Sequence, residues 1–161
     1  MKLIQQKLFS TTRIFAQNVD RFFRRECFIT GKPFRTKEKI LDFMTQELEQ
    51  LGLMDKAASD SVKEREKASP TEIGNLVAIP HPMVNNAAIS SISVLVLKNP
   101  ILWVEHQVQV VFLLSIATNE FYLWEPIFLK LFKYLVKENG VRRLLNNPDY
   151  DAFIKDFKQS F

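Results

Sequence analysis

The sequence has few of the residues that mark a secreted, metal-binding or disordered protein. Its 161 residues include a single cysteine, Cys27, which cannot form an internal disulfide and has no second thiol with which to bind a metal cluster. Only four glycines and seven prolines are present, without a repeat or a biased tract. We therefore expect one folded domain in a reducing compartment, with Cys27 as a small, partly buried residue.

Long apolar segments are also missing. The longest stretch, from Val108 to Ala117, is interrupted by Gln109 and Ser115. It is much shorter than the roughly twenty residues that cross a bilayer. Residues 1–16 contain no apolar block followed by a small-residue cleavage site, which argues against a secretory signal. We expect a cytoplasmic protein with no membrane insertion.

The net charge of +4 could indicate nucleic-acid binding, because contacts to phosphate dominate that kind of affinity. The basic residues, however, occur in short groups such as Arg24-Arg25 and Arg142-Arg143, without the interleaved aromatics of a single-strand platform. A solvated basic surface is the better interpretation, and we expect no direct contact with nucleic acid.

Helical patterns dominate the first part of the chain. From Phe9 to Phe23, apolar residues recur every three to four positions, which predicts one amphipathic helix over much of the first thirty residues. Gly31-Lys32-Pro33 ends this segment. Thr36 is the expected N-cap of a second helix that stops at Gly52. The apolar face of this second helix comprises Ile40, Leu41, Met44, Leu48 and Leu51. A short polar helix is expected over residues 60–67.

The second half of the chain predicts strands and then helices. Residues 76–79, 92–97 and 108–116 are largely apolar, as in strands covered on both faces, and a polar connection containing Asn99-Pro100 separates the last two. A helix over residues 120–137 follows, with Pro126 as a kink or a restart and Asn139-Gly140 as its end. A short helical turn over residues 141–145 and a last helix capped by Asp149 close the chain. The pattern predicts an α/β fold, a small central sheet with helices packed on both faces, but it does not determine the strand order.

The sequence lacks the motifs of several enzyme classes. HExxH and paired CxxC spacings are absent, as are the GxSxG elbow, the Walker loop and the GxGxxG fingerprint. We therefore expect no metal and no cofactor. The remaining candidates are the two histidines, His81 and His106. His81 lies between Pro80 and Pro82, which restrict its backbone, and a fixed neutral imidazole is a good nucleophile. Taken alone, such a histidine more often has a structural role.

The residues before His81 change this balance. They read Glu64-Arg65-Glu66-Lys67, Ser69-Pro70-Thr71, Gly74-Asn75 and Val77-Ala78-Ile79-Pro80-His81. This pattern resembles the IIA domains of the phosphoenolpyruvate-dependent sugar phosphotransferase system, fructose/mannitol class (EIIA type 2), with the spacing from Arg65 to His81 kept without a gap. The resemblance covers residues 20–161 of a single domain, in which residues 1–19 form a helical lead-in or linker. It implies a small mixed sheet.

The resemblance also implies a phosphoryl carrier without a cofactor. In this family the histidine of the AIPH block accepts a phosphoryl group from the phosphocarrier protein HPr and passes it to a cysteine of an EIIB domain, so His81 takes this role. Arg65 matches the arginine that stabilises the transferred charge; without the resemblance, it would be read as a surface salt-bridge residue. Thr71 and Gly74, together with Pro80 and Pro82, are expected to shape the site, with the Thr71 hydroxyl as a hydrogen-bond donor.

One departure from the family pattern separates the possible roles. Transport members often carry a second histidine directly after the Asn-Glu step, where this chain has Asn119-Glu120-Phe121. His106 cannot take that place and is expected to be an ordinary surface loop residue. The loss of the second imidazole, together with Pro82 and the helical lead-in, favours the EIIA-like domains of BglG-type transcriptional regulators. Two alternatives stay open: an EIIA phosphocarrier in sugar uptake, and an interaction module that is not phosphorylated.

Overall fold

The computed structural model describes residues 1–84 and 87–160, without the side chains of residues 8–11, so the predicted apolar contribution of Phe9 lies outside the described residues. The elements follow the chain in this order: α1 (Lys2–Phe22), β1 (Phe23–Lys32), α2 (Lys37–Gln50), α3 (Lys56–Ala68), β2 (Glu72–Gly74), β3 (Leu76–Ala78), β4 (Ser91–Leu102), β5 (Gln107–Ser115), the 3-10 turn η1 (Thr118–Glu120), α4 (Phe121–Val136), α5 (Gly140–Asn146) and α6 (Tyr150–Gln159).

Within the described residues, the strands form one five-stranded mixed sheet in the order β1-β4-β5-β3-β2. β1 runs parallel to β4, and β3 runs parallel to β5. The β4–β5 and β2–β3 pairs are antiparallel. β3 and β5 therefore end on the same side of the sheet, where β4 begins. The loops that follow β3 and β5 and the loop that precedes β4 meet on this side.

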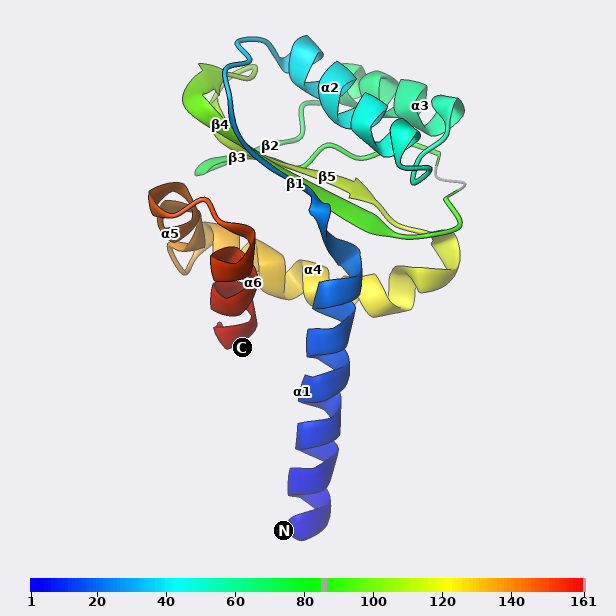
Figure 1. Cartoon of the computed structure of the whole chain (residues 1–161), viewed down its shortest axis with the longest axis vertical. Coiled ribbons are helices and arrows are strands. Elements are labelled where there is room, and N and C mark those ends of the chain that lie inside the picture. Colours follow the sequence, from blue (N-terminus) through cyan, green and yellow to red (C-terminus); the bar gives the residue numbers. More distant parts are fainter. Residues whose placement is uncertain (85–86, 161) are drawn as a thin grey trace.

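The sheet is covered on both faces, which confirms the predicted α/β fold. α2 and α3 lie on one face, and α4, α5 and α6 lie on the other (Figure 1). Along β4, Val94 and Val96 pack into the core on the side of α4, whereas Leu95 and Leu97 pack into the core on the side of α2. Because alternate side chains of a strand point to opposite faces, a strand covered on both sides must be apolar at nearly every position.

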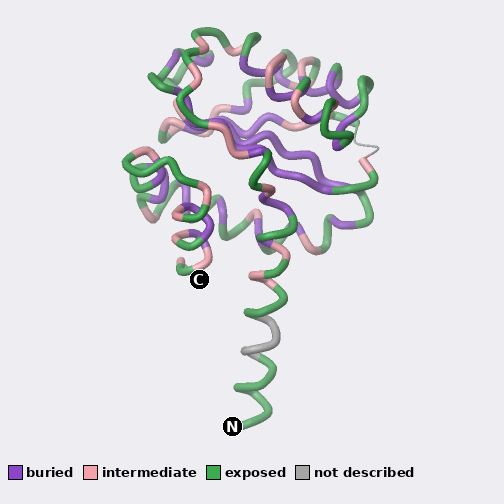
Figure 2. Tube along the Cα trace, in the orientation of Figure 1, coloured by how far each residue is buried: buried purple, intermediate pink, exposed green. Residues whose placement is uncertain are grey.

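Helix α1 extends away from these layers (Figure 1). Val19 and Phe22, near its C-terminal end, are fully buried, whereas Leu3 and Ile4 are exposed (Figure 2). No helix in the described part of the chain is long and apolar enough to cross a membrane.

Several local signals are confirmed. The Thr36 hydroxyl accepts a hydrogen bond from the Lys39 N–H at the start of α2, and Asp149 accepts one from the Ala152 N–H at the start of α6. The three predicted strands are present, and α4 continues through Pro126. These features depend on neighbouring residues, which is why the sequence reveals them.

The predicted helix over the first thirty residues is wrong for residues 23–32, which form the edge strand β1. Phe23 and Cys27 are buried there, and the backbone pairs with β4 through contacts such as Phe28 with Val94. Phe23 follows Val19 by four residues, a spacing that suits a continuing helix equally well. The strand forms because β4 offers an unpaired backbone edge, which is a tertiary effect.

Other boundaries also differ from the predictions. α3 begins at Lys56, because the Asp55 side chain accepts a hydrogen bond from the Ala58 N–H, and not near residue 60. Asn99-Pro100 belongs to β4, at a register shift where the sheet tolerates a proline. Leu51 is exposed just after α2. The pair predicted to end α4 instead starts α5 at Gly140. β2 escaped prediction because three residues carry almost no periodicity.

Candidate phosphoryl-transfer site

The loop that carries His81 begins where β3 ends. Ile79 donates a backbone hydrogen bond to the Thr71 carbonyl over 3.0 Å, and the Leu114 N–H donates to the Pro80 carbonyl over 3.0 Å. The first bond ties the loop to the segment before β2, and the second ties it to β5. Pro80 is buried, and Pro82 follows His81 as a half-buried residue. Hydrogen bonds and proline geometry together hold the backbone of His81 in place.

A hydrogen bond also defines the chemistry of the His81 ring. Nδ1 lies 3.0 Å from the Ile79 carbonyl oxygen. A carbonyl oxygen can only accept, so Nδ1 carries the proton, and in the neutral ring Nε2 then keeps its lone pair. The half-buried imidazole is thus oriented with Nε2 as its nucleophilic nitrogen.

His81 lines a cavity of about 430 Å³ at the edge of the sheet where β3 and β5 end. Arg65, Thr71 and Pro82 line the same cavity, so the structure brings together four of the six predicted site residues. Gly74 and Pro80 are not among the lining residues. The rest of the wall is mostly apolar, apart from the acidic residue Glu72, and includes Pro70, Ile73, Ile79, Leu114, Ile116, Phe121, Trp124, Phe128 and Phe132.

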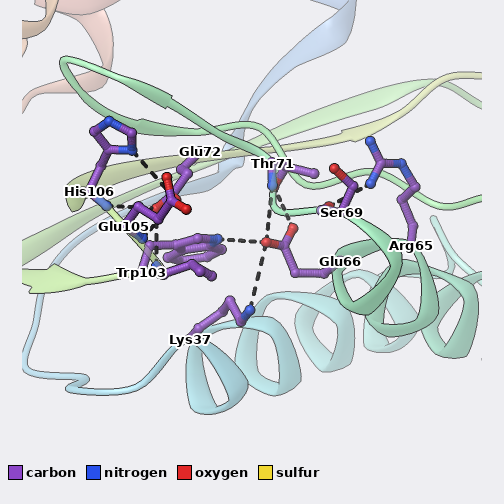
Figure 3. A network of polar contacts seen from close by, with 10 residues as sticks. Lys37, Arg65, Glu66, Ser69, Thr71, Glu72, Trp103, Glu105 and His106 are labelled. Carbon is purple, nitrogen blue, oxygen red and sulfur yellow. Dashed lines mark hydrogen bonds and ion pairs between the residues drawn. The ribbon is translucent and has the colours of Figure 1, made fainter.

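Arg65 lies in the last turn of α3. Its Nη1 donates a hydrogen bond of 2.6 Å to the Ser69 carbonyl, which fixes the guanidinium beside the cavity (Figure 3). A guanidinium carries five N–H donors, so this single bond leaves donors for the oxygens of a phosphoryl group.

Glu66, the neighbour of Arg65, is a buried carboxylate whose importance the sequence reasoning missed. Its Oε2 accepts the Thr71 hydroxyl over 2.5 Å, and its Oε1 accepts the Thr71 N–H over 3.1 Å and the Trp103 indole N–H over 2.7 Å. The Lys37 ammonium lies 3.9 Å from Oε1 (Figure 3). The Thr71 hydroxyl was expected to donate a hydrogen bond at the site, and in the structure it donates to Glu66. The sequence did contain a signal for the burial of Glu66. Glu66 lies four positions after Val62, so the two residues share one helix face, and Val62 is buried.

Gly74 belongs to the tight connection between β2 and β3. Gly74, Asn75 and Leu76 have φ angles of 82°, 53° and 67°, all in the left-handed region. Glycine adopts this region without steric cost, whereas other residues are strained there. The Asn75 side-chain amide donates to the Leu135 carbonyl, which holds the turn against α4. Gly74 therefore sets the path of the chain between β2 and β3, and its expected effect on the site stays a prediction.

His106 lies in the exposed connection between β4 and β5 and does not line the cavity. Its Nδ1 is 3.5 Å from Glu72 Oε1. Glu72 also accepts the backbone N–H groups of Val104, Glu105 and His106 (Figure 3). Burial opposes ionisation of Glu72, but the three backbone donors and the His106 side chain together outweigh it and lower the pKa of this carboxyl. Glu72 thus anchors the loop that carries His106.

A mixed α/β domain with one histidine and one arginine beside an apolar cavity is the architecture of a phosphotransferase-system IIA domain. Residues 21–160 match the family described as phosphoenolpyruvate-dependent sugar phosphotransferase system, EIIA 2. The chain belongs to this family, as the signature around His81 predicted. The division into a lead-in of residues 1–19 and a core from residue 20 stays a prediction.

Two curated relatives are transcriptional regulators from Bacillus subtilis (strain 168). The chain is 38% identical to the probable licABCH operon regulator over 143 residues, which cover 89% of this chain and 22% of the regulator. It is 29% identical to the transcriptional regulator ManR over 121 residues, which cover 70% of this chain and 19% of ManR. The chain thus spans about a fifth of the length of these relatives.

Solved structures show the same fold at low sequence identity. Enzyme IIA-Mtl, solved in complex with phosphorylated enzyme IIB-Mtl from Escherichia coli, is 18% identical with a TM-score of 0.68, and the match covers 87% of this chain and 100% of that one. The nitrogen regulatory protein IIA-Ntr from Neisseria meningitidis is 18% identical with a TM-score of 0.66, and the match covers 86% and 95% of the two chains.

Proposed function

We propose that this chain is a phosphorylatable EIIA domain that accepts a phosphoryl group from HPr on Nε2 of His81. The observation that carries the proposal is the hydrogen bond from His81 Nδ1 to the Ile79 carbonyl. It leaves Nε2 with the lone pair and holds the ring in a cavity that Arg65 also lines.

In the proposed step, the lone pair of His81 Nε2 attacks the phosphorus of the HPr phosphohistidine. The phosphorus–nitrogen bond of the donor breaks, its electron pair returns to the donor imidazole, and a new phosphorus–nitrogen bond forms at His81. The Nδ1 proton stays on the hydrogen bond to Ile79, which stabilises the ring as it loses electron density. Arg65 offers N–H donors to the phosphoryl oxygens in transit.

The apolar wall of the cavity has a role in this proposal. Phe121, Trp124 and Phe128 line part of the site with side chains that cannot activate water. Exclusion of water strengthens the interaction between Arg65 and the phosphoryl group and slows hydrolysis of the phosphohistidine. A long-lived phosphohistidine suits a domain whose phosphorylation is read as a signal.

We further propose that the domain acts within a sugar-responsive transcriptional regulator. The 38% identity to an operon regulator supports this assignment, as does Phe121, which lines the cavity at the place of the second family histidine. The alternative is an EIIA phosphocarrier in sugar uptake, which needs rapid onward transfer to an EIIB cysteine. The two assignments differ in that second transfer.

The test is intact-mass spectrometry after incubation with phosphoenolpyruvate, enzyme I and HPr at mildly alkaline pH, where phosphohistidine survives. Wild type and His106→Ala should each gain one phosphate, and His81→Ala should gain none. Lack of transfer to wild type, while a known EIIA control is phosphorylated, would leave an EIIA fold that acts only in binding. Efficient transfer from the phosphorylated domain to an EIIB partner would favour the uptake role.

A further inference from the structure

Glu120 is a second buried carboxylate, outside the chemistry described above. It is 5% exposed and is the last residue of η1, directly before α4. Its Oε1 accepts hydrogen bonds from the Ser90 N–H over 3.3 Å and from the Ser90 hydroxyl over 3.0 Å. Its Oε2 forms an ion pair with the guanidinium of Arg21 on α1. One side chain therefore joins α1, the start of β4 and the start of α4.

These contacts close a ring around η1. The Ala117 N–H donates to the Ser90 hydroxyl oxygen over 2.8 Å, and the Glu120 N–H donates to the Ala117 carbonyl over 2.8 Å. Both ends of the turn are thus fixed to Ser90. The residues on either side of the ring, Ile116 and Phe121, line the cavity that contains His81. The ring therefore adjoins two residues of the cavity wall.

The buried charge of Glu120 needs a partner. A buried carboxylate is costly unless it is paired, and removal of one partner leaves the other charge uncompensated. The Oε2 atom has no hydrogen bond from the rest of the ring, so its compensation comes from Arg21. The Arg21 side chain is 53% exposed, whereas that of Glu120 is 7% exposed. The position of α1 therefore bears directly on the η1 ring.

We propose that Glu120 is a positioning residue for phosphorylation of His81, and that its ion pair with Arg21 makes the geometry of the cavity depend on α1. This inference rests on the proposed function, because its kinetic consequence is a change in phosphoryl transfer. Glu120 acts through Phe121 and Ile116 and does not contact the phosphoryl group. Helix α1 extends from the body of the domain (Figure 1). The Arg21–Glu120 ion pair links α1 to the η1 ring, in addition to the packing of Phe22 on Trp124, which lines the cavity.

The experiment compares Arg21→Gln with Asp20→Asn in the full chain. Asp20 is the neighbour of Arg21 on α1 and pairs with Lys158 on α6, away from the cavity, so its variant is a matched loss of one ion pair. We expect Arg21→Gln to lower kcat for transfer from HPr roughly three- to thirtyfold, with little change in KM, and Asp20→Asn to leave both unchanged. Arg21→Lys should recover most of the rate. Arg21→Gln combined with Glu120→Gln should be faster than Arg21→Gln alone, because the unpaired charge is gone.

A second readout does not need phosphorylation. Nuclear magnetic resonance of the unphosphorylated protein should show shifts of the His81 ring nitrogens and the Trp124 indole in Arg21→Gln and no shifts in Asp20→Asn. Equal rates and unchanged His81 and Trp124 signals in Arg21→Gln would overturn the inference. If Arg21→Gln does not fold, Arg21→Lys and Ser90→Ala are compared in the same way. A wild type that is not phosphorylated contradicts the proposed function, while the resonance shifts still decide the positioning role.

Discussion

Thr71, which lines the cavity with His81, donates its hydroxyl proton to the buried carboxylate of Glu66 across 2.5 Å. Glu66 also accepts from the Trp103 indole, so the bond links the rim of the site to the core on the side of α2. Thr71 therefore supports the site by holding its own loop, and its hydroxyl is not directed toward an incoming phosphoryl group.

Replacement of Thr71 tests this link. Thr71→Val keeps the shape but leaves Glu66 without its hydroxyl donor, and we expect a loss of about 1–3 kcal/mol in the free energy of unfolding. Thr71→Ser keeps the donor and serves as the matched control, with a smaller loss. Urea denaturation followed by tryptophan fluorescence measures both. Equal stability of Thr71→Val and wild type would mean that the bond adds nothing to the fold.

Arg65 can be tested by a change that keeps its charge. Arg65→Lys loses the planar set of donors, so we expect transfer from HPr to His81 to slow roughly tenfold to a hundredfold, which corresponds to about 1.4–2.8 kcal/mol of barrier. Quenched-flow phosphorylation with labelled phosphoenolpyruvate gives the rate. Arg142→Lys, at an exposed position on α5, is the control and should transfer normally. An unchanged rate in Arg65→Lys would show that the planar donors of Arg65 do not contribute to phosphoryl transfer.

Alanine substitutions at Gly74 and Gly31 separate the effect of backbone strain on stability from an effect on phosphorylation. Both have a positive φ, 82° and 75°, and a Cβ at either position would meet no atom within 4 Å. Gly74→Ala and Gly31→Ala should therefore each destabilise the fold by about 1–2 kcal/mol through backbone strain alone. Only Gly74→Ala, in the turn that leads to His81, should also slow phosphorylation. A slower rate in Gly31→Ala of the same size would show that the effect is general destabilisation.

Glu72 predicts a specific dependence of stability on pH. Its pKa in the folded protein is lowered below the ordinary value of 4.5, because its backbone donors and the His106 side chain together outweigh the opposing effect of burial. A lowered folded pKa adds stability above the unfolded pKa, and this stability is lost as the pH falls through the folded value. Wild type should thus be more stable than Glu72→Gln at pH 7, with the difference shrinking below pH 4.5. Chemical denaturation across this range measures it, and a difference independent of pH would contradict the assignment.

Much of the fold and part of the site could be predicted from local sequence. The caps Thr36 and Asp149 and the apolar runs of β4 and β5 depend on residues close in the chain. The signature from Arg65 to His81 was enough to identify the family, because helix α3, the turn at Gly74 and the proline-bounded loop are contiguous. These features were readable because their physical causes are short-range.

Tertiary contacts decided the rest. β1 is a strand because β4 pairs with it, although its own residues also suit a helix. Glu66 acquires its role from Trp103 and Lys37, and Glu120 acquires its role from Ser90 and Arg21. An acidic residue in a sequence does not show which distant donors will surround it. The sequence by itself therefore determined the family and the candidate nucleophile, whereas only the packing of α1, α2 and α4 around the sheet decided which distant groups surround the buried carboxylates Glu66 and Glu120.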